Sequence, residues 1–262
     1  MELVCLKDLC ENSVDVLKKN DAFDIEYIDI SSVNNISKKI ISTQLLNASS
    51  APSRAKQLVK QGDILVSTVR PNLNAVAMVN TNSDETLVAS TGFCVLRYKK
   101  EVLNKYIFYF CQSQSFIDDM VSQATGASYP AVTSSIVKSV KIPFVPMEAQ
   151  KKIVEKLDKI TDLINKRKEQ LSKMDELVKA RFVELFGDIN INDRGWDIEP
   201  LGNLCDISRG GSPRPIEQYL GGTIPWIKIG DATKGDNIYL HATKEHIIQE
   251  GVRKSRLVKK VV

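Results

Sequence analysis

Apolar and polar positions alternate or cluster in short runs through the first 146 residues. Asp24 to Ile30 alternates as a strand does, and several β-branched or apolar runs end at turn residues. These patterns predict a strand or helix start at 3–9, strands over 24–30, 62–69, 75–79, 92–97 and 137–142, and helices over 102–112 and 116–124. The mixture predicts an α+β domain that spans residues 1–146.

The pattern changes at Met147. From there to Phe186 the chain contains neither Pro nor Gly, and apolar residues recur in alternating steps of four and three. This spacing predicts a long coiled-coil helix over 147–187, used as a spacer or for dimerisation, with Arg167 interrupting its seam. A second helix, from this chain or another, would bury the seam; packing of the helix on its own domain is the alternative. The seam comprises Ile153, Leu157, Ile160, Ile164, Leu171, Met174 and Val178.

The beginning of the chain recurs after this helix. Leu6–Glu11 (LKDLCE) is echoed by Leu201–Asp206 (LGNLCD). At one shared offset, Tyr27–Ile30 is echoed by Trp226–Ile229, and Leu58–Lys60 by Leu257–Lys259. Internal repetition of this kind indicates a repeated structural unit. We therefore expect residues 188–262 to form a linker and the N-terminal part of a second domain. Without the strands that would close its core, that part is expected to be marginally stable.

Composition narrows the class of protein. No apolar run approaches the ~20 residues that a membrane-spanning helix needs. Five cysteines without a Cys-x-x-Cys pair, and without a signal peptide, are typical of reduced thiols in a cytoplasmic protein. The net charge of +4 permits a polyanionic partner without requiring one.

Familiar catalytic motifs are missing from the sequence. There is no Gly-Lys dipeptide, hence no P-loop, and there is neither a Gly-x-Gly-x-x-Gly nor a Gly-x-Ser-x-Gly pattern. His241 and His246 are the two histidines, and they lack the Cys or His neighbours of a structural metal site. We therefore expect a protein that is not an enzyme and that holds neither a metal nor a cofactor of its own.

Several segments resemble one family closely. These segments are Gly62–Pro71, Ser90–Arg97, Gly126–Val132, Ile142–Pro146 followed by Glu148–Ile153, and Ala180–Asp188. Together they resemble the specificity subunits of type I restriction–modification systems. The exit Ile-Pro-x-x-Pro into a long helix is the most specific of these motifs, and the resemblance covers essentially the whole chain.

The resemblance implies a function. A specificity subunit of this family carries two target recognition domains, each reading one half of a split site in double-stranded DNA, held apart by two antiparallel helices. Modification subunits that bind S-adenosylmethionine and restriction subunits assemble around it, so S-adenosylmethionine, ATP and Mg²⁺ belong to those partners. This chain departs from the pattern, with one complete domain, one helix and the opening of a second domain. It is then either a half-size subunit that forms a homodimer through its helix or the product of a disrupted gene.

Candidate DNA-binding residues lie in loops of the first domain. Arginine pairs with guanine and asparagine with adenine, whereas hydroxyl groups and backbone amides suit phosphates. For Arg70 the alternative is a surface turn, and for Tyr129 it is packing against Pro130. Lys138 and Lys141, expected on one strand face, are interpreted as solvated. The candidates are Arg54, Lys56, Arg70, Asn72, Asn74, Thr125, Ser128 and Tyr129.

Two other functions stay open at this point. The chain is also compatible with a coiled-coil interaction or scaffold protein that does not bind DNA. The sequence also leaves open an inactive fragment that donates recognition-domain sequence by recombination. The abundance of Arg, Asn and hydroxyl groups in the loops at 53–56, 70–74 and 125–129 favours DNA recognition over a scaffold. The sequence does not reveal which bases are read, because base preference depends on loop geometry and DNA shape.

Overall fold

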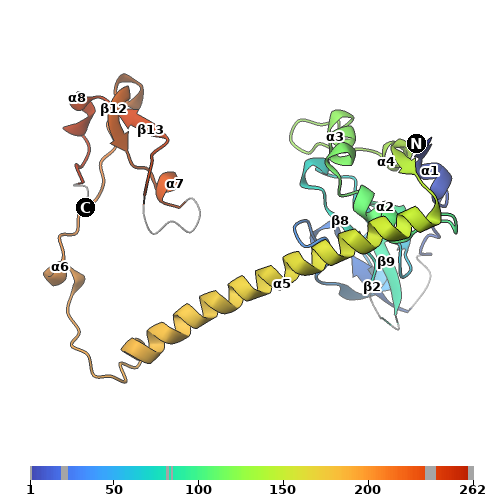
Figure 1. Ribbon diagram of the computed structural model, residues 1–262, viewed down its shortest axis with the longest axis horizontal. Coiled ribbons are helices and arrows are strands. Elements are labelled where there is room, and N and C mark those ends of the chain that lie inside the picture. Colours follow the sequence, from blue (N-terminus) through green and yellow to red (C-terminus); the bar gives the residue numbers. More distant parts are fainter. Residues whose placement is uncertain (1, 19–22, 81–82, 84, 234–239, 259–262) are drawn as a thin grey trace. The chain divides into compact units, whose positions relative to one another are not determined.

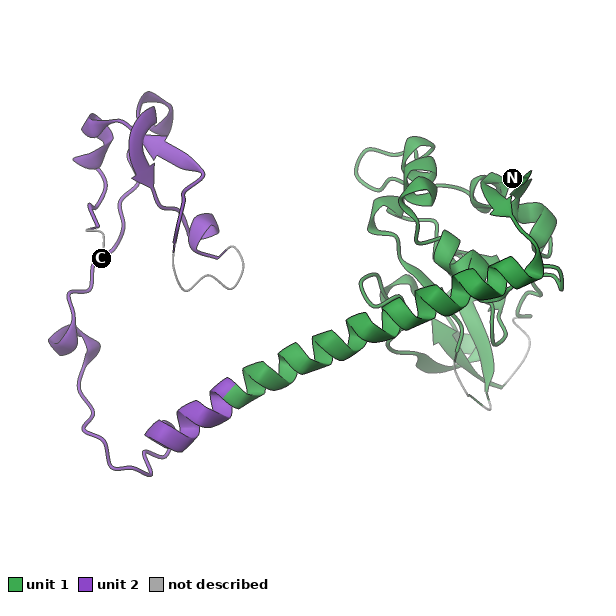
Figure 2. Ribbon diagram, in the orientation of Figure 1, with its two compact units in different colours: residues 1–177 green, residues 178–262 purple. Residues whose placement is uncertain are grey.

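The structure is a computed structural model that describes residues 2–18, 23–80, 83, 85–233 and 240–258. It divides into two compact units, Met1–Leu177 and Val178–Val262 (Figure 2). This division falls inside the long helix, whereas the sequence predicted boundaries at the two ends of the helix. The three-part division at 146 and 187 therefore stays a prediction.

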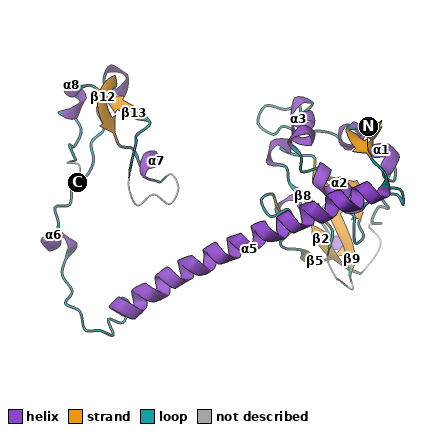
Figure 3. Cartoon of the chain, viewed as in Figure 1, coloured by secondary structure: helices purple, strands orange, loops and turns teal. Residues whose placement is uncertain are grey.

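Unit 1 contains two principal sheets (Figure 3). In the first, β2 pairs antiparallel with β5 and parallel with β9, and β9 pairs antiparallel with β6. In the second, β7 lies between β10 and β8, antiparallel to both. Strand β1 pairs with β11, and β3 with β4. The strands are β1 (Glu2–Cys5), β2 (Asp24–Ile28), β3 (Val33–Asn34), β4 (Lys39–Ile40), β5 (Gln44–Asn47), β6 (Ala55–Leu58), β7 (Ile64–Ser67), β8 (Val76–Met78), β9 (Thr86–Ser90), β10 (Phe93–Leu96) and β11 (Lys141–Phe144).

Strand β7 forms the centre of the core because it is buried on both faces. Ile64 and Val66 pack in one apolar cluster with residues of the helices, whereas Leu65 packs in a second cluster with Ile28 and Ala89 of the first sheet. Successive side chains of a strand point to opposite faces, so the β10–β7–β8 sheet lies between these two layers. This explains why its strands read as continuous apolar runs.

Short helices connect the strands of unit 1. They are α1 (Leu6–Leu9), α2 (Asn104–Phe110), α3 (Gln114–Ser122) and α4 (Ser134–Ser139), with single 3₁₀ turns η1 (Ile30–Ser32), η2 (Ala48–Ser50) and η3 (Pro71–Leu73). Side-chain caps mark two helix starts, since Ser113 Oγ accepts from the Phe116 amide at 3.3 Å and Thr133 Oγ1 from the Ile136 amide at 3.2 Å.

The strand predicted over 137–142 is wrong in its first half. The Thr133 cap starts helix α4, and the strand begins only at Lys141. Lys138 and Lys141 therefore do not share a strand face. The ammonium of Lys138 donates instead to the carbonyls of Glu11 and Asn12, at 3.0 and 2.8 Å.

Helix α5 (Met147–Phe186) is anchored to unit 1 by its first three turns. The fully buried side chain of Gln150 accepts from the Leu103 amide at 2.9 Å and donates to the Val145 carbonyl at 2.9 Å. One turn later Val154 enters the core, and one turn after that Asp158 accepts from Lys105 Nζ at 2.7 Å and the Tyr109 hydroxyl at 2.6 Å. Residues four apart share one helix face, so these contacts form a single seam of attachment.

Beyond Asp158 the helix is exposed along its whole length, and it extends away from the sheets of unit 1 (Figure 1). Among the predicted seam residues, Ile164 is 49% exposed, Leu171 62% and Met174 61%. The first domain therefore does not cover the apolar stripe, which disfavours the alternative in which the helix packs on its own domain.

Unit 2 repeats the local structure of the beginning of unit 1. In α6 (Leu201–Leu204) the Cys205 amide donates to the Leu201 carbonyl at 3.1 Å, as the Cys10 amide donates to Leu6 at 3.0 Å. Strand β12 (Leu220–Trp226) pairs antiparallel with β13 (Glu245–Ile247), as β2 pairs with β5. The other elements are η4 (Ile216–Gln218), α7 (Ile229–Ala232) and α8 (Gln249–Val252).

The turn after the repeated strand is also the same in both copies. The amide of Lys228 donates to the Asp231 carboxylate at 3.0 Å, just as the amide of Asp29 donates to Ser32 Oγ at 3.1 Å. The sequence repeat is therefore a structural repeat. Its last echoed residue, Lys259, lies outside the described residues.

The two copies differ in burial. Leu201 is 65% exposed where its counterpart Leu6 is fully buried, and Ile227 is 50% exposed where Ile28 is fully buried. In unit 1 these positions are covered by residues of later strands and helices, such as Ile64 and Leu65 of β7. Within the described part of unit 2, β12–β13 is the sheet that forms.

The anchoring of α5 gives the first prediction. Replacement of Gln150 by Ala leaves the partly buried Leu103 amide and Val145 carbonyl without their partner, which costs about 1–3 kcal/mol of unfolding free energy. Urea unfolding followed by far-ultraviolet circular dichroism measures this loss. The matched control is Gln170→Ala, an exposed glutamine on the same helix, which should change stability by less than about 0.5 kcal/mol. Equal effects of the two substitutions would contradict the anchoring role.

Candidate nucleic-acid interface

Two of the predicted loops meet at one surface of unit 1. The Arg70 amide donates to the Pro130 carbonyl at 2.7 Å, and Val69 forms a β-bridge with Ala131. The guanidinium carbon of Arg70 lies 4.7 Å from the centre of the Tyr129 ring, within the range of a cation–π contact. Both side chains are exposed, Tyr129 by 67%. The structure thus combines a flat aromatic ring and a planar cation that the sequence presented as separate candidates.

The backbone at Arg70 is unusual. Its φ of 49° and ψ of 62° are left-handed, a backbone conformation that residues other than Gly, Asn and Asp rarely adopt. The 3₁₀ turn η3 follows, and its end residue Asn74 is left-handed as well, with φ 47°. Asn72 lies exposed between the two. This double reversal projects the Arg70 and Asn72 side chains from a tight, hydrogen-bonded turn.

Asn74 was predicted to contact DNA, and the structure places its side chain in the interior of unit 1. Its side chain is 7% exposed. The amide nitrogen donates to the Cys111 carbonyl at 2.8 Å, and the amide oxygen accepts from Lys38 Nζ at 2.7 Å. Asn74 therefore stabilises the turn through hydrogen bonds on its interior side. Lys38 was missed by sequence reasoning because nothing in a lysine of a polar turn points to a partner 36 residues away.

The remaining candidates are exposed, and all but Lys56, which lies in β6, are in loops. Thr125 and Ser128 belong to the same loop as Tyr129, which the Thr125–Ala131 bridge closes. Arg54 and Lys56 flank the start of β6. The Thr91 amide donates to the Arg54 carbonyl at 2.9 Å, and the Thr68 amide donates to the Gly92 carbonyl at 2.9 Å. Through the Thr91–Gly92 turn, the loop of Arg54 is thus linked to the strand end that leads to Arg70.

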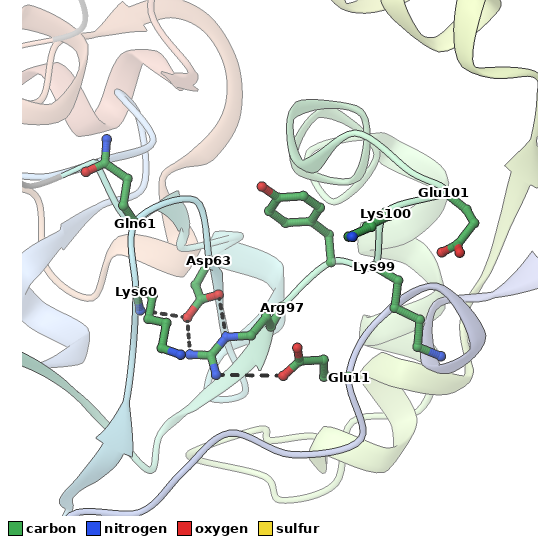
Figure 4. Close-up of a pocket in the computed structure, with 9 residues that line it drawn as sticks. Glu11, Lys60, Gln61, Asp63, Arg97, Lys99, Lys100 and Glu101 are labelled. Atoms are coloured by element: carbon green, nitrogen blue, oxygen red, sulfur yellow. Dashed lines mark hydrogen bonds and ion pairs between the residues drawn. The ribbon is translucent and has the colours of Figure 1, made fainter.

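A pocket of unit 1 lies elsewhere, lined by residues such as Lys60, Asp63 and Arg97. It has a volume of about 570 Å³, and Asp63 and Arg97 pair within it (Figure 4). Arg97 Nη2 and Nε donate to the two Asp63 oxygens at 2.7 and 3.0 Å, and the Lys60 amide donates to the same carboxylate at 2.8 Å. The Asp63 carboxylate is 2% exposed and paired on both oxygens, so it has a structural role in linking the Lys60 turn to Arg97.

The buried thiols are chemically inert. Burial raises the pKa of the Cys10 thiol to about 12, and it also raises the pKa values of Cys94 and Cys111. These thiols stay protonated at neutral pH, so they are poor nucleophiles and poor metal ligands. In the described part of the chain, no group of three or more His, Cys, Asp or Glu side chains is placed to hold a metal ion. None of the described helices is both long and apolar enough to cross a membrane.

Comparison with known proteins identifies the family. The model of the type I restriction modification DNA specificity domain matches residues 1–173. The chain belongs to this family. The matched segment covers most of unit 1 and ends inside α5, and it includes Arg70 and Tyr129. The family expected from the sequence motifs is therefore confirmed.

Curated relatives extend the likeness to most of the chain. The MjaIX specificity subunit of Methanocaldococcus jannaschii is 24% identical over 247 residues, covering 88% of this chain and 54% of the relative. The EcoKI specificity subunit of Escherichia coli is 22% identical over 249 residues, covering 86% of this chain and 53% of the relative. The chain thus spans about half the length of these relatives.

Solved structures show the same fold. The specificity subunit HsdS of Thermoanaerobacter tengcongensis is similar with a TM-score of 0.58 and 28% identity, over 93% of this chain and 66% of that one. A chain from a study of the assembly and conformational transition of the type I restriction–modification system is similar with a TM-score of 0.62 and 29% identity. It covers 86% of this chain and 60% of the other. The predicted α+β fold with a long helix is confirmed.

The ion pair in the pocket gives the second prediction. Asp63→Ala leaves a guanidinium that is 11% exposed without its partner and should cost about 3–5 kcal/mol of unfolding free energy. Glu11→Ala is the control, because Glu11 is 50% exposed and 3.7 Å from the same arginine, and it should cost less than about 1 kcal/mol. Chemical denaturation measures both. Similar small losses would show that the pocket pair contributes little to stability.

Proposed function

We propose that this chain is the DNA-recognition subunit of a type I restriction–modification complex. It directs partner methyltransferase and endonuclease subunits to a split target in double-stranded DNA. The observation that carries the proposal is the exposed Arg70–Tyr129 pair, which lies within the segment matched by the family. The chain itself is non-catalytic in this account, and S-adenosylmethionine, ATP and Mg²⁺ act on the partner subunits.

The chemistry of the exposed loops suits duplex DNA. An arginine held in a fixed orientation donates two parallel hydrogen bonds to the edge of a guanine, and Asn72 next to it suits adenine. Thr125 and Ser128 offer hydroxyl groups, and Arg54 and Lys56 offer positive charge to phosphates. In this proposal Arg70 and Asn72 select bases, whereas the other residues set the register of the domain on the duplex.

The helix supplies the spacing between two recognition events. Lys159 to Phe186 spans about 42 Å at ~1.5 Å per residue, and its apolar stripe is exposed. A second helix of the same pattern would bury Ile160, Ile164 and Leu171, as in a coiled coil. We propose that two copies of this chain associate through these helices. Two-fold symmetry would then make the two halves of the target inverted copies of each other.

Co-purification with the cognate modification subunit tests the function. The expected result is a stable complex whose mass, measured by light scattering, contains two copies of this chain. A complex with one copy would support the recognition role but contradict the homodimer. No complex with the modification subunit would contradict the proposal that the chain is a specificity subunit.

The third prediction concerns base reading. Arg70→Ala in the complex should weaken binding of the target duplex by about 1–3 kcal/mol, since it removes a bidentate contact. A fluorescence titration with the target and with non-specific DNA measures this change. Lys173→Ala removes an equal charge from the exposed helix, at a position outside the apolar seam, and serves as the control. Unchanged affinity and unchanged sequence preference after Arg70→Ala would remove Arg70 from the interface.

The fourth prediction concerns the seam. Leu157→Glu together with Ile164→Glu places two carboxylates in the apolar stripe and should abolish self-association or binding of the modification subunit. Sedimentation and pull-down measure the two interactions. The control is Lys166→Gln with Lys173→Gln, which makes the same change of charge on the face of the helix away from the seam and should leave both interactions intact. If the seam variant behaved as the wild type, the coiled-coil interpretation would be wrong.

A further inference from the structure

Three residues with left-handed backbone lie in the Arg70 turn and in the segment that contacts it. Lys38, Arg70 and Asn74 have φ values of 56°, 49° and 47°. Lys38 ends the turn between β3 and β4, and its ammonium donates to the backbone oxygen of Asn74 at 2.5 Å and to its side-chain oxygen at 2.7 Å. A chain segment remote in sequence therefore holds the end of the turn that presents Arg70.

The Asn74 side chain also bonds to the core of unit 1. Its amide nitrogen donates to the carbonyl of Cys111, a fully buried residue at the end of α2. Both polar groups of the Asn74 side chain are thus engaged on opposite sides, one with Lys38 and one with Cys111. The β3–β4 turn, η3 and the end of α2 are cross-linked through one buried amide.

This cross-link opposes a real conformational cost. A left-handed residue with a side chain costs about 1–2 kcal/mol relative to its preferred regions. Asn adopts this conformation more readily than Arg does. The following Pro71 also disfavours the right-handed helical region at Arg70. If the turn were released, Arg70 would relax to extended backbone with ψ near ~120–160° in place of 62°. The accompanying rotation about the N–Cα bond of Arg70, from a positive φ of 49° to a negative one, would carry the guanidinium off the Tyr129 ring.

Among the described residues, Lys38 forms no ion pair with a carboxylate. Its ammonium instead donates both of its hydrogen bonds there to Asn74. Its ammonium therefore serves geometry rather than charge neutralisation. We propose that Lys38 is a positioning residue for base readout, which fixes Asn74 and thereby keeps Arg70 stacked on Tyr129 in the DNA-reading orientation. This inference rests on the proposed function and assigns to Lys38 no contact with DNA.

The test compares Lys38→Met with Lys39→Met in the complex with the modification subunit. Both remove one positive charge, and Lys39 is the exposed neighbour on β4. The probe is the duplex that the wild-type complex selects from a random pool, alongside duplexes in which each base pair of that site is changed in turn. The readouts are the affinity ratio between target and changed sites, the dependence of affinity on salt, and the unfolding midpoint.

We expect Lys38→Met to lower the affinity ratio at one base pair about tenfold, as loss of a bidentate contact does, without a change in salt dependence beyond that of Lys39→Met. Lys38→Arg, which keeps a donor, should restore most of the ratio. Lys38→Met combined with Arg70→Ala should be no worse than Arg70→Ala alone, because both act on one contact.

Three results would overturn the inference. The Lys38→Met complex could keep the same affinity ratio between target and changed sites as the Lys39→Met complex. Alternatively, the loss caused by Lys38→Met could add fully to the loss caused by Arg70→Ala. If Arg70→Ala itself changed nothing, the role of Arg70 would fail and that of Lys38 with it, a failure distinguishable from the other two. If the unfolding midpoint showed that Lys38→Met does not fold, Lys38→Gln, which retains a shorter donor, would carry the same measurements.

Discussion

The buried amide of Gln150 is the contact on which the rest of the structure depends. A helix can set the distance between two recognition events only if it leaves the domain in a fixed direction. Gln150 provides this by engaging the Leu103 amide and the Val145 carbonyl at once, and Val154 and Asp158 extend the attachment over two more turns. Burial of an amide is favourable only when its groups are paired, so the joint is specified by geometry and not merely by apolar contact.

The two copies of the repeat separate local from long-range causes. The same short helix, strand and capped turn form in both units, because capping and alternation are decided within a few residues. Burial is decided elsewhere. Leu6 is buried in unit 1 because other elements cover it, including β7, whereas Leu201 has the same local structure and stays exposed. Local sequence thus builds the elements, and later strands complete the core.

Elements decided by local sequence were predictable, whereas those decided by long-range contacts were not. The strands around Ile64 and Phe93 were predictable because they are apolar on both faces, and the long helix because its spacing is regular. Strands β5, β6 and β9 were not predicted, since β5 and β9 form by pairing with β2, and β6 by pairing with β9, all of them distant in sequence. The Thr133 cap was overlooked, which turned a helix into a predicted strand.

The site shows where such reasoning ends. Arg70 and Tyr129 were chosen separately for their chemistry, but their contact arises from a β-bridge between remote segments. Asn74 was assigned to DNA because it lies in the same polar turn. Its partners, Lys38 and Cys111, are 36 and 37 residues away, and they make it a support for the turn. Residue type indicates what a side chain can do, whereas tertiary contacts decide whether it faces a ligand.

The central claim is that this chain supplies sequence specificity to a partner that lacks it. Selection of bound duplexes from a random pool tests this most directly, with the modification subunit alone and with the modification subunit bound to this chain. The account predicts a two-part motif with a fixed gap, enriched only when this chain is present, and two parts that are inverted copies if it acts as a homodimer. Enrichment of no motif by the complex, or of the same motif without this chain, would contradict the account.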